Sequence, residues 1–298
     1  MKRILVTTIR RGRPLEDSGR AYVVDWSTQK VVEQCGMLPV NARFPSNPRG
    51  GIRGLRGVHV GFKDGILIAS NDTISILNEK LQLQGTIHNR LFCNLHELRA
   101  HGGDLYAVSC GLDAIVSVST DSVLKSFVHH EDLFTGRDRF DDIDRHGITR
   151  PNSLDFYKGE PVVSLAESNI ISIGQKDEED LVLAFHKGKP HSVTVSGDVL
   201  YWTMAEDRTV CSQDMLSGHM TTQFTDKKPW WFRDTQMTRW GWLRGMAIAK
   251  NIMFVGSSPY ARVIAMCPDY GIKKGEIKLS NLKSEAVSSI VLFPGDWK

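Results

Sequence analysis

The chain has 298 residues, 41% of them hydrophobic and 24% charged, so it is long and apolar enough to bury a core without disulfides or metal staples. Its 37 basic and 34 acidic residues give a net charge of +3, and this balance argues against nucleic acid as a partner. The five cysteines form no CxxC pair and indicate reduced thiols. The first residues are too polar for a signal peptide, and no stretch of about 18 residues is apolar, so we expect a cytoplasmic protein without a membrane segment.

One pattern recurs five times along the chain. It consists of an anchor residue, about five residues of alternating apolar character, a tight turn, and two β-rich runs separated by a second turn. The anchors are His59, His96, Asn152, His191 and Gly245. Because the turns are rich in Gly, Asn and Asp and lie between β-branched runs, each copy predicts a small sheet of hairpins.

A sixth copy is split between the two ends of the sequence. SSIVLFPGDW near the C-terminus supplies a first strand, with Ser289 near the anchor position, and ILVTTI, AYVVDW and KVVEQC near the N-terminus supply the later strands. A propeller removes exposed sheet edges by joining such halves. The sequence therefore predicts an all-β, six-bladed β-propeller over residues 1–298, closed by pairing of the C-terminal strand with the N-terminal blade. The alternative is an irregular β-sandwich, which explains neither the repeat nor the split copy.

The anchors of a propeller gather around one mouth of the central channel, because each begins the innermost strand of its blade. We therefore expect His59, His96 and His191 to converge, with Asn152 beside them. Converging neutral imidazoles suit a divalent metal ion, zinc above all, with calcium or manganese as alternatives. The competing interpretation is that the anchors only form hydrogen bonds to the neighbouring blade.

Carboxylates in the second turns reach the same mouth. Glu167 and Asp113 each follow a β-rich run closely, so they are our candidates for a catalytic base. Glu97 alternates with His96 and is expected to point into the sheet packing, away from the site. Acidic residues are also common in exposed turns, and this simpler explanation stays open.

Basic residues precede the anchors, and they include Arg56, Arg150 and Arg244. Guanidinium groups bind carboxylate or phosphate through two parallel hydrogen bonds, so the three arginines predict an anionic ligand. Solvated loop charges are an equally good explanation at this stage.

Two insertions, at about residues 129–149 and 222–243, precede inner strands and should lie on the face of the channel mouth. The second holds four of the seven tryptophans, of which Trp231 and Trp240 are our candidates for contact with substrate. This tryptophan-rich loop could act as a lid or as a contact surface for a protein partner. Alternatively, it forms a small satellite core of its own.

Short motifs carry a resemblance to known propellers. RPNSLDF resembles the inner strand of sugar-lactonase and gluconolactonase propellers, and Asn152 matches a metal ligand of that family. KPHSVTV resembles strand starts of the virginiamycin B lyase type. KPHSVTVSGDVLYW and LRGMAIAKNIMFVGSSPYAR are similar to bacterial propeller proteins of unknown function. These resemblances imply a site at the channel mouth, and three histidines there resemble the arrangement in peptidylglycine amidating lyases.

The function that we expect from these observations is a metal-dependent lyase or hydrolase acting on a small anionic molecule, without nucleic acid or membrane partners. The alternative is a non-catalytic propeller that binds a small ligand or, through the tryptophan-rich loop, a protein.

Overall fold

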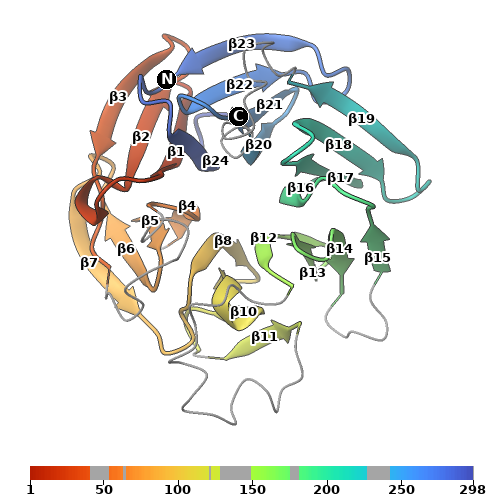
Figure 1. Cartoon of the computed structure of the whole chain (residues 1–298), viewed down its shortest axis with the longest axis horizontal. Helices are drawn as coiled ribbons and strands as arrows, with labels where there is room; N and C mark the ends of the chain where they lie inside the picture. Colours follow the sequence, from red (N-terminus) through yellow and green to blue (C-terminus); the bar gives the residue numbers. More distant parts are fainter. Residues whose placement is uncertain are drawn as a thin grey trace.

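The computed structural model describes residues 1–40, 54–62, 65–120, 122–127, 149–174, 181–226 and 242–297. Over these ranges the chain forms six four-stranded antiparallel sheets arranged as the blades of a ring (Figure 1). The helical residues in this part of the chain are two short 3-10 turns, η1 (Leu15–Asp17) and η2 (Cys110–Leu112). None of its helices is long and apolar enough to cross a membrane. The predicted all-β class and the number of blades are confirmed.

Blades are numbered here in chain order, and each has its innermost strand first. Blade 1 consists of β24 (Glu285–Leu292), β1 (Arg3–Arg10), β2 (Gly19–Asp25) and β3 (Lys30–Cys35). Blade 2 consists of β4 (Val58–Phe62), β5 (Gly65–Ser70), β6 (Thr73–Leu77) and β7 (Leu83–His88). Blade 3 consists of β8 (Leu95–His101), β9 (Asp104–Ser109), β10 (Ala114–Ser117) and β11 (Val123–Ser126).

The other three blades follow the same order. Blade 4 consists of β12 (Pro151–Tyr157), β13 (Glu160–Leu165), β14 (Ile170–Ile173) and β15 (Leu181–Ala184). Blade 5 consists of β16 (Pro190–Ser196), β17 (Val199–Met204), β18 (Thr209–Asp214) and β19 (Met220–Thr225). Blade 6 consists of β20 (Leu243–Ala249), β21 (Ile252–Ser257), β22 (Arg262–Met266) and β23 (Lys273–Lys278). Since β19 extends to Thr225, residues 222–225 of the predicted second insertion belong to blade 5.

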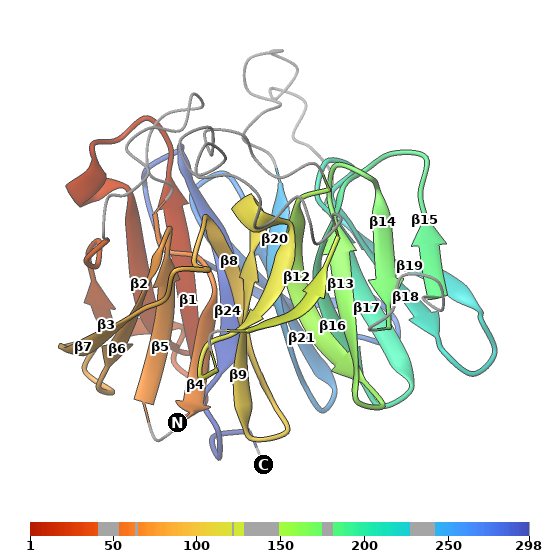
Figure 2. The same cartoon turned by 90° about the horizontal axis from the view of Figure 1, so that it is seen from below.

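The ring closes through blade 1, as the split repeat predicts. Strand β24 pairs antiparallel with β1 from Ile4 opposite Leu292 to Arg10 opposite Glu285. The N- and C-terminal residues consequently lie near each other at one end of the ring (Figure 2). Without this pairing, β1 and β24 would each expose unpaired backbone groups along one edge, so the pairing stabilises the closed ring.

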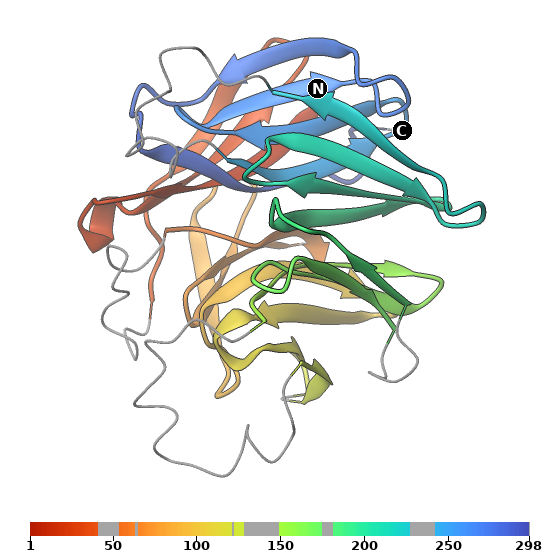
Figure 3. The same ribbon diagram turned by 45° about the vertical axis from the view of Figure 1, so that its right-hand side comes forward.

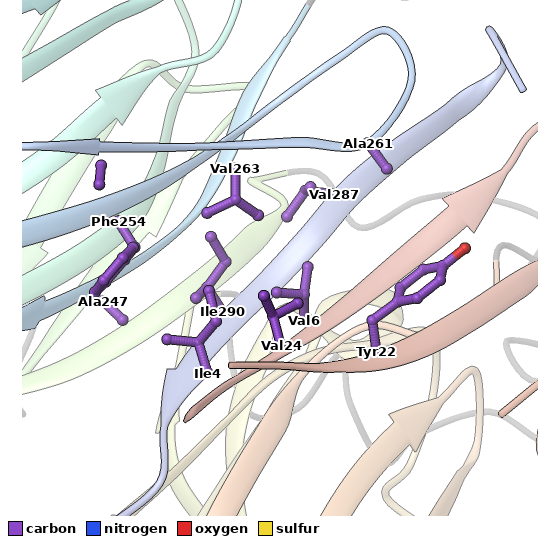
Figure 4. Packing of buried hydrophobic residues seen from close by; sticks show 11 residues of the cluster. Ile4, Val6, Tyr22, Val24, Ala247, Phe254, Ala261, Val263, Val287 and Ile290 are labelled. Atoms are coloured by element: carbon purple, nitrogen blue, oxygen red, sulfur yellow. The ribbon is translucent and has the colours of Figure 1, made fainter. Parts of the chain in front are cut away.

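The core lies between the blades. In β5, Ile66 and Ile68 pack toward blade 1 whereas Leu67 and Ala69 pack toward blade 3, because side chains alternate along a strand. Among the described residues, six clusters of buried apolar side chains fill the six junctions. Figure 4 shows the cluster where blade 6 meets blade 1, in which Phe254 and Val263 face Ile4 and Val24. The outermost strands, such as β3 and β19, are largely exposed (Figure 3).

Candidate functional site

A pocket opens where the inner strands of blades 3 to 6 begin. Its volume is about 60 Å³. It is lined by His96, Cys110, Arg150, Asn152, Ala166, Glu167, Lys189, His191, Ala205, Glu206, Trp242 and Arg244. Six of the predicted site residues therefore meet here: His96, Asn152, His191, Glu167, Arg150 and Arg244.

The residue that corresponds to His96 in blade 2 is Arg56, not His59. The register of the first two strands shows this. In blades 3, 4 and 6, one residue of the inner strand pairs with the residue that lies two positions before the end of the second strand: Leu98, Leu154 and Met246. In blade 2, the residue of β4 that pairs at this level is Val58. The anchors of these three blades each lie two residues earlier in the chain: His96 before Leu98, Asn152 before Leu154 and Arg244 before Met246. By the same count, Arg56 belongs to the ring of anchors and His59 lies three residues deeper.

His59 is therefore not among the residues that line the pocket, which brings His96 and His191 together without it. His59 lies at the same depth along its inner strand as Arg99 does in blade 3. Burial and the charge of Arg99 lower the pKa of His59 to about 4. The cause of the misplacement is Gly61, whose φ of 95° and register shift give β4 an irregular end before its turn. Gly245 is likewise displaced by one position, because the anchor of blade 6 is Arg244.

A constant spacing in the sequence identifies the correct anchors. The tight turn after each inner strand contains a residue with positive φ: Gly102, Lys158, Gly197 and Lys250. The anchor lies six residues before this position in blades 3 to 6. Counting back from the turn would have selected Arg244, whereas alignment on the apolar pattern selected Gly245.

His191 is the most buried imidazole at the pocket, with 6% of its surface exposed. Its Nδ1 lies 3.0 Å from the carbonyl oxygen of Lys189, and since a carbonyl only accepts, Nδ1 carries the proton. The lone pair is then on Nε2. Burial and the nearby positive charge of Arg244 hold the pKa of His191 well below its usual value, so the ring is neutral at pH 7.

Asn152 is buried and uses its amide within the protein. Its Nδ2 donates to the carbonyl oxygen of Pro190 at 3.3 Å, and its Oδ1 accepts from Ser164 Oγ at 2.8 Å. Both bonds fix the orientation of the side chain at the start of β12. The predicted alternative, in which an anchor ties its blade to the next, describes this residue well.

Charged residues alternate along the rim of the pocket. Glu167 forms ion pairs with Arg150 and, at 3.5 Å, with Lys189. Lys189 also lies 3.4 Å from Glu206. Lys189 and Glu206 thus lie beside Arg150 and Glu167 at the rim, and the lining as a whole carries three cations and two carboxylates.

Arg150 and Lys189 hold unusual backbone conformations, with φ of 52° and 53°. Both lie two residues before their anchors, where blade 2 has Gly54 and blade 3 has Asn94, also with positive φ. Gly and Asn adopt this left-handed region readily, whereas Arg and Lys do so at a cost. The cationic side chains are thus held at the rim by a strained backbone.

Asp113 has a structural function in this arrangement. Its Oδ1 accepts hydrogen bonds from the backbone N–H of Thr149 at 3.0 Å, from Thr149 Oγ1 at 2.7 Å and from the N–H of Arg150 at 2.9 Å. Asp113 is buried and is not among the lining residues, so it positions the segment that carries Arg150. Arg56, the third predicted arginine, is also buried and outside the lining.

Trp242 forms one wall of the pocket, and the guanidinium of Arg244 lies 4.4 Å from its ring centroid. Such a contact fixes the orientation of the arginine side chain at the wall of the pocket. Trp231 and Trp240 lie outside the described residues.

The donor set fits a metal ion poorly. In the part of the chain that the structure describes, no group of three or more His, Cys, Asp or Glu side chains is arranged to hold one. The pocket offers two imidazoles and an amide that is already hydrogen-bonded, beside Arg150, Lys189 and Arg244. Because like charges repel in a site of low dielectric constant, these cations favour an anion over a divalent cation.

Known proteins share the fold at low sequence identity. No family model and no curated protein matches the chain. A solved structure of a protein of unknown function from Bacteroides caccae has 10% identity and a TM-score of 0.65, covering 98% of this chain and 99% of that chain. A chain of the nidogen/laminin complex has 12% identity and a TM-score of 0.64, covering 98% of both. Virginiamycin B lyase from Staphylococcus aureus has 12% identity and a TM-score of 0.52, covering 75% of this chain and 69% of that chain. Together with the six closed sheets, these matches define the chain as a six-bladed β-propeller.

Proposed function

We propose that the pocket binds a small anionic molecule and that the protein is a lyase or hydrolase acting on it. The observation that carries this proposal is the meeting of Arg150, Lys189 and Arg244 with a neutral His191 in one cavity of about 60 Å³. The volume suits a carboxylate or phosphate group with few further atoms. Buried guanidinium groups bind such anions with charge-assisted hydrogen bonds.

His191 is the residue best suited to accept a proton from the bound molecule. A base must be unprotonated at the working pH, and the lowered pKa of His191 ensures this. The hydrogen bond from its Nδ1 to Lys189 fixes the ring and leaves Nε2 as the accepting atom. Glu167, our predicted base, is paired with two cations and is the weaker candidate, because its negative charge is already compensated.

The same residues support a lyase or hydrolase reaction, and the likeness in fold to virginiamycin B lyase is compatible with it. Removal of a proton from the carbon beside a carboxylate gives elimination when the electron pair expels a leaving group from the next carbon. Removal of a proton from water gives hydrolysis when the water attacks an ester carbonyl and the alcohol leaves. In both cases Arg244 would hold the anionic group while His191 takes the proton. The expected zinc, calcium or manganese ion does not fit the donor set, and no step requires it.

Binding can be tested with acetate, butyrate, succinate and inorganic phosphate, measured by calorimetry on the whole protein. We expect at least one of these anions to bind, and Arg244→Gln to weaken binding about tenfold or more, since a hydrogen bond to a charged group contributes about 1.5–3 kcal/mol. Lys250→Gln, at the turn that ends the same strand β20, is the matched loss of charge outside the pocket and should leave affinity unchanged. Equal effects of the two variants would overturn the proposal.

The same protein distinguishes the remaining alternatives. Zinc, manganese or calcium chloride, each added alone, should not raise the melting temperature of the wild-type protein. If one of them does, and the double variant His96→Ala plus His191→Ala no longer shows the rise, the metal hypothesis would be restored. Anion binding that survives His191→Ala, with no turnover of unsaturated acids or esters in wild type, would favour the non-catalytic module. The chain in the nidogen/laminin complex has a similar fold, so this module remains a candidate.

A further inference from the structure

The backbone of Trp242 is held by the turn that follows β21. In the register of blade 6, Leu243 pairs with Ser257, so Trp242 and Ser258 are the next residues to meet. The N–H of Trp242 donates to Ser258 Oγ at 2.8 Å, and its carbonyl oxygen accepts from the N–H and from Oγ of Ser258, both at 3.1 Å. Since Ser258 is only 2% exposed, one buried hydroxyl bonds to both backbone groups of Trp242.

Ser258 is fixed in turn by a buried ion pair. Arg208 is also 2% exposed, and its Nη1 donates to the carbonyl oxygen of Ser258 at 2.9 Å. Arg208 pairs with Asp226, and Arg262 lies 2.9 Å from the same carboxylate. Ser257 Oγ donates to this carboxylate at 2.7 Å. Because several hydrogen bonds compensate the charges of this cluster, the turn is a firm support for the residues bonded to it.

Trp242 connects this turn to the pocket. It lines the pocket, and the guanidinium of Arg244 lies 4.4 Å from its ring centroid. Arg11 lies 3.9 Å from the same centroid, so two guanidinium groups contact one indole ring. Ser258 is not among the residues that line this pocket. Any influence of its hydroxyl on a ligand must therefore pass through Trp242.

We propose that Ser258 is a positioning residue for the anion site. Its hydroxyl fixes the backbone of Trp242, the indole fixes the guanidinium of Arg244, and Arg244 binds the anion. Without the hydroxyl, the indole is held less firmly, and the guanidinium that contacts it is less well aligned for directional hydrogen bonds to the anion. This inference rests on the proposed function, because it assumes that Arg244 binds an anion.

Calorimetry with acetate, butyrate, succinate and inorganic phosphate tests the proposal on the whole protein. We expect Ser258→Ala to weaken the tightest-binding of these anions about threefold to tenfold, which corresponds to the loss of a hydrogen bond. Ser257→Ala is the matched control, because this neighbouring serine is equally buried but its hydroxyl bonds to Asp226 and Arg262. The control should lower the melting temperature at least as much as Ser258→Ala does and leave the affinity for the anion unchanged.

A double-mutant cycle separates positioning from a general loss of stability. In the Arg244→Gln background the guanidinium is absent, so Ser258→Ala should cause little further loss of affinity there. A loss in this background as large as in the wild-type background would show that the hydroxyl does not act through Arg244, and would overturn the inference.

The remaining outcomes identify which proposal fails. If an anion binds and Arg244→Gln weakens it, but Ser258→Ala does not, this inference is wrong and the proposed function stands. The same holds if Ser257→Ala weakens the anion as much as Ser258→Ala does. If none of the four anions binds wild type, the proposed function fails, and this inference fails with it.

Discussion

The two halves of the channel mouth use polar side chains differently. On the side of blades 3 to 6, the anchors His96, Asn152, His191 and Arg244 line a pocket. On the side of blades 1 and 2, Arg56 is buried outside that pocket, and its carbonyl oxygen accepts a hydrogen bond from Thr7 Oγ1.

On the side of blades 1 and 2, where the ring closes (the closing side), charged groups also pair within the protein. Glu285 at the start of β24 is fully buried and bonded to Arg10. Glu167 on the pocket side is partly exposed, and its ion-pair partners Arg150 and Lys189 line the pocket. Equivalent ends of the blades can therefore serve either the integrity of the ring or the binding of a ligand, and the partners of each side chain decide which.

The largest effect is expected from the closing side. Deletion of residues 286–298 removes Val287, Ile290 and Phe293 from two interblade clusters and leaves β1 with an open edge. Loss of a large core side chain costs about 2–5 kcal/mol, so losing three costs about 6–15 kcal/mol, which is comparable to the whole stability of an ordinary domain. We expect an unfolded or aggregated product by circular dichroism.

Deletion of residues 294–298 is the control for this truncation. It retains β24 but removes the ion pair between Asp296 and Arg3 and the contact of Trp297 with Phe254. This shorter deletion should yield a folded protein of lower melting temperature. A native melting temperature for the longer deletion would contradict the role of β24 in closing the ring.

A smaller, pH-dependent effect is expected where the two sides meet. Glu97 is partly buried, and its Oε1 accepts a hydrogen bond from Ser289 Oγ of β24 at 3.1 Å. Burial raises the pKa of Glu97 to about 7, so the folded protein holds a proton that the unfolded chain has lost. Its contribution to stability is present below pH 4.5 and is lost as pH rises toward 7.

Glu97→Gln should therefore be more stable than wild type by about 3 kcal/mol at pH 8 and nearly equal to it at pH 4. Urea denaturation across this range measures the difference. His59 acts in the opposite direction, because its lowered pKa weakens the fold as pH falls from 6.5 toward 4. The comparison of Glu97→Gln with wild type removes this background, and a gain that is independent of pH would contradict the assignment.

The smallest effect on stability, with a clear effect on binding, is expected on the pocket side. Lys189→Asn replaces a strained residue by one that tolerates positive φ, as Asn94 does in blade 3. The lost ion pairs are partly exposed and stabilise little. Unfolding free energy should stay equal or rise by up to about 1 kcal/mol, while affinity for the best anion of the panel falls severalfold. A loss of stability above 1 kcal/mol would instead show that Lys189 supports the fold.

The sequence predicts the fold better than it predicts the site. The repeat, the turn chemistry and the split copy suffice for six blades and their closure, because alternation and turns are local properties. The anchors of blades 3 to 5 follow as well. The position of the anchor in blade 2 could not be predicted from the apolar pattern, because Gly61 interrupts the spacing of β4. The function of Asp113 depends on a hydrogen bond from the backbone N–H of Arg150, which is far away in the sequence and leaves no local pattern.

Closure by β24 has a consequence for the order of events during synthesis. Strands β1 to β3 are synthesised before the other strands of the ring, yet the inner strand of their blade is made only when residues 285–292 have been added. Throughout translation, β1 therefore exposes an edge whose backbone groups can pair with another chain. Messages that stop early would yield rings with one incomplete blade, so truncated chains of this protein should be efficient seeds of aggregation and early targets of proteases.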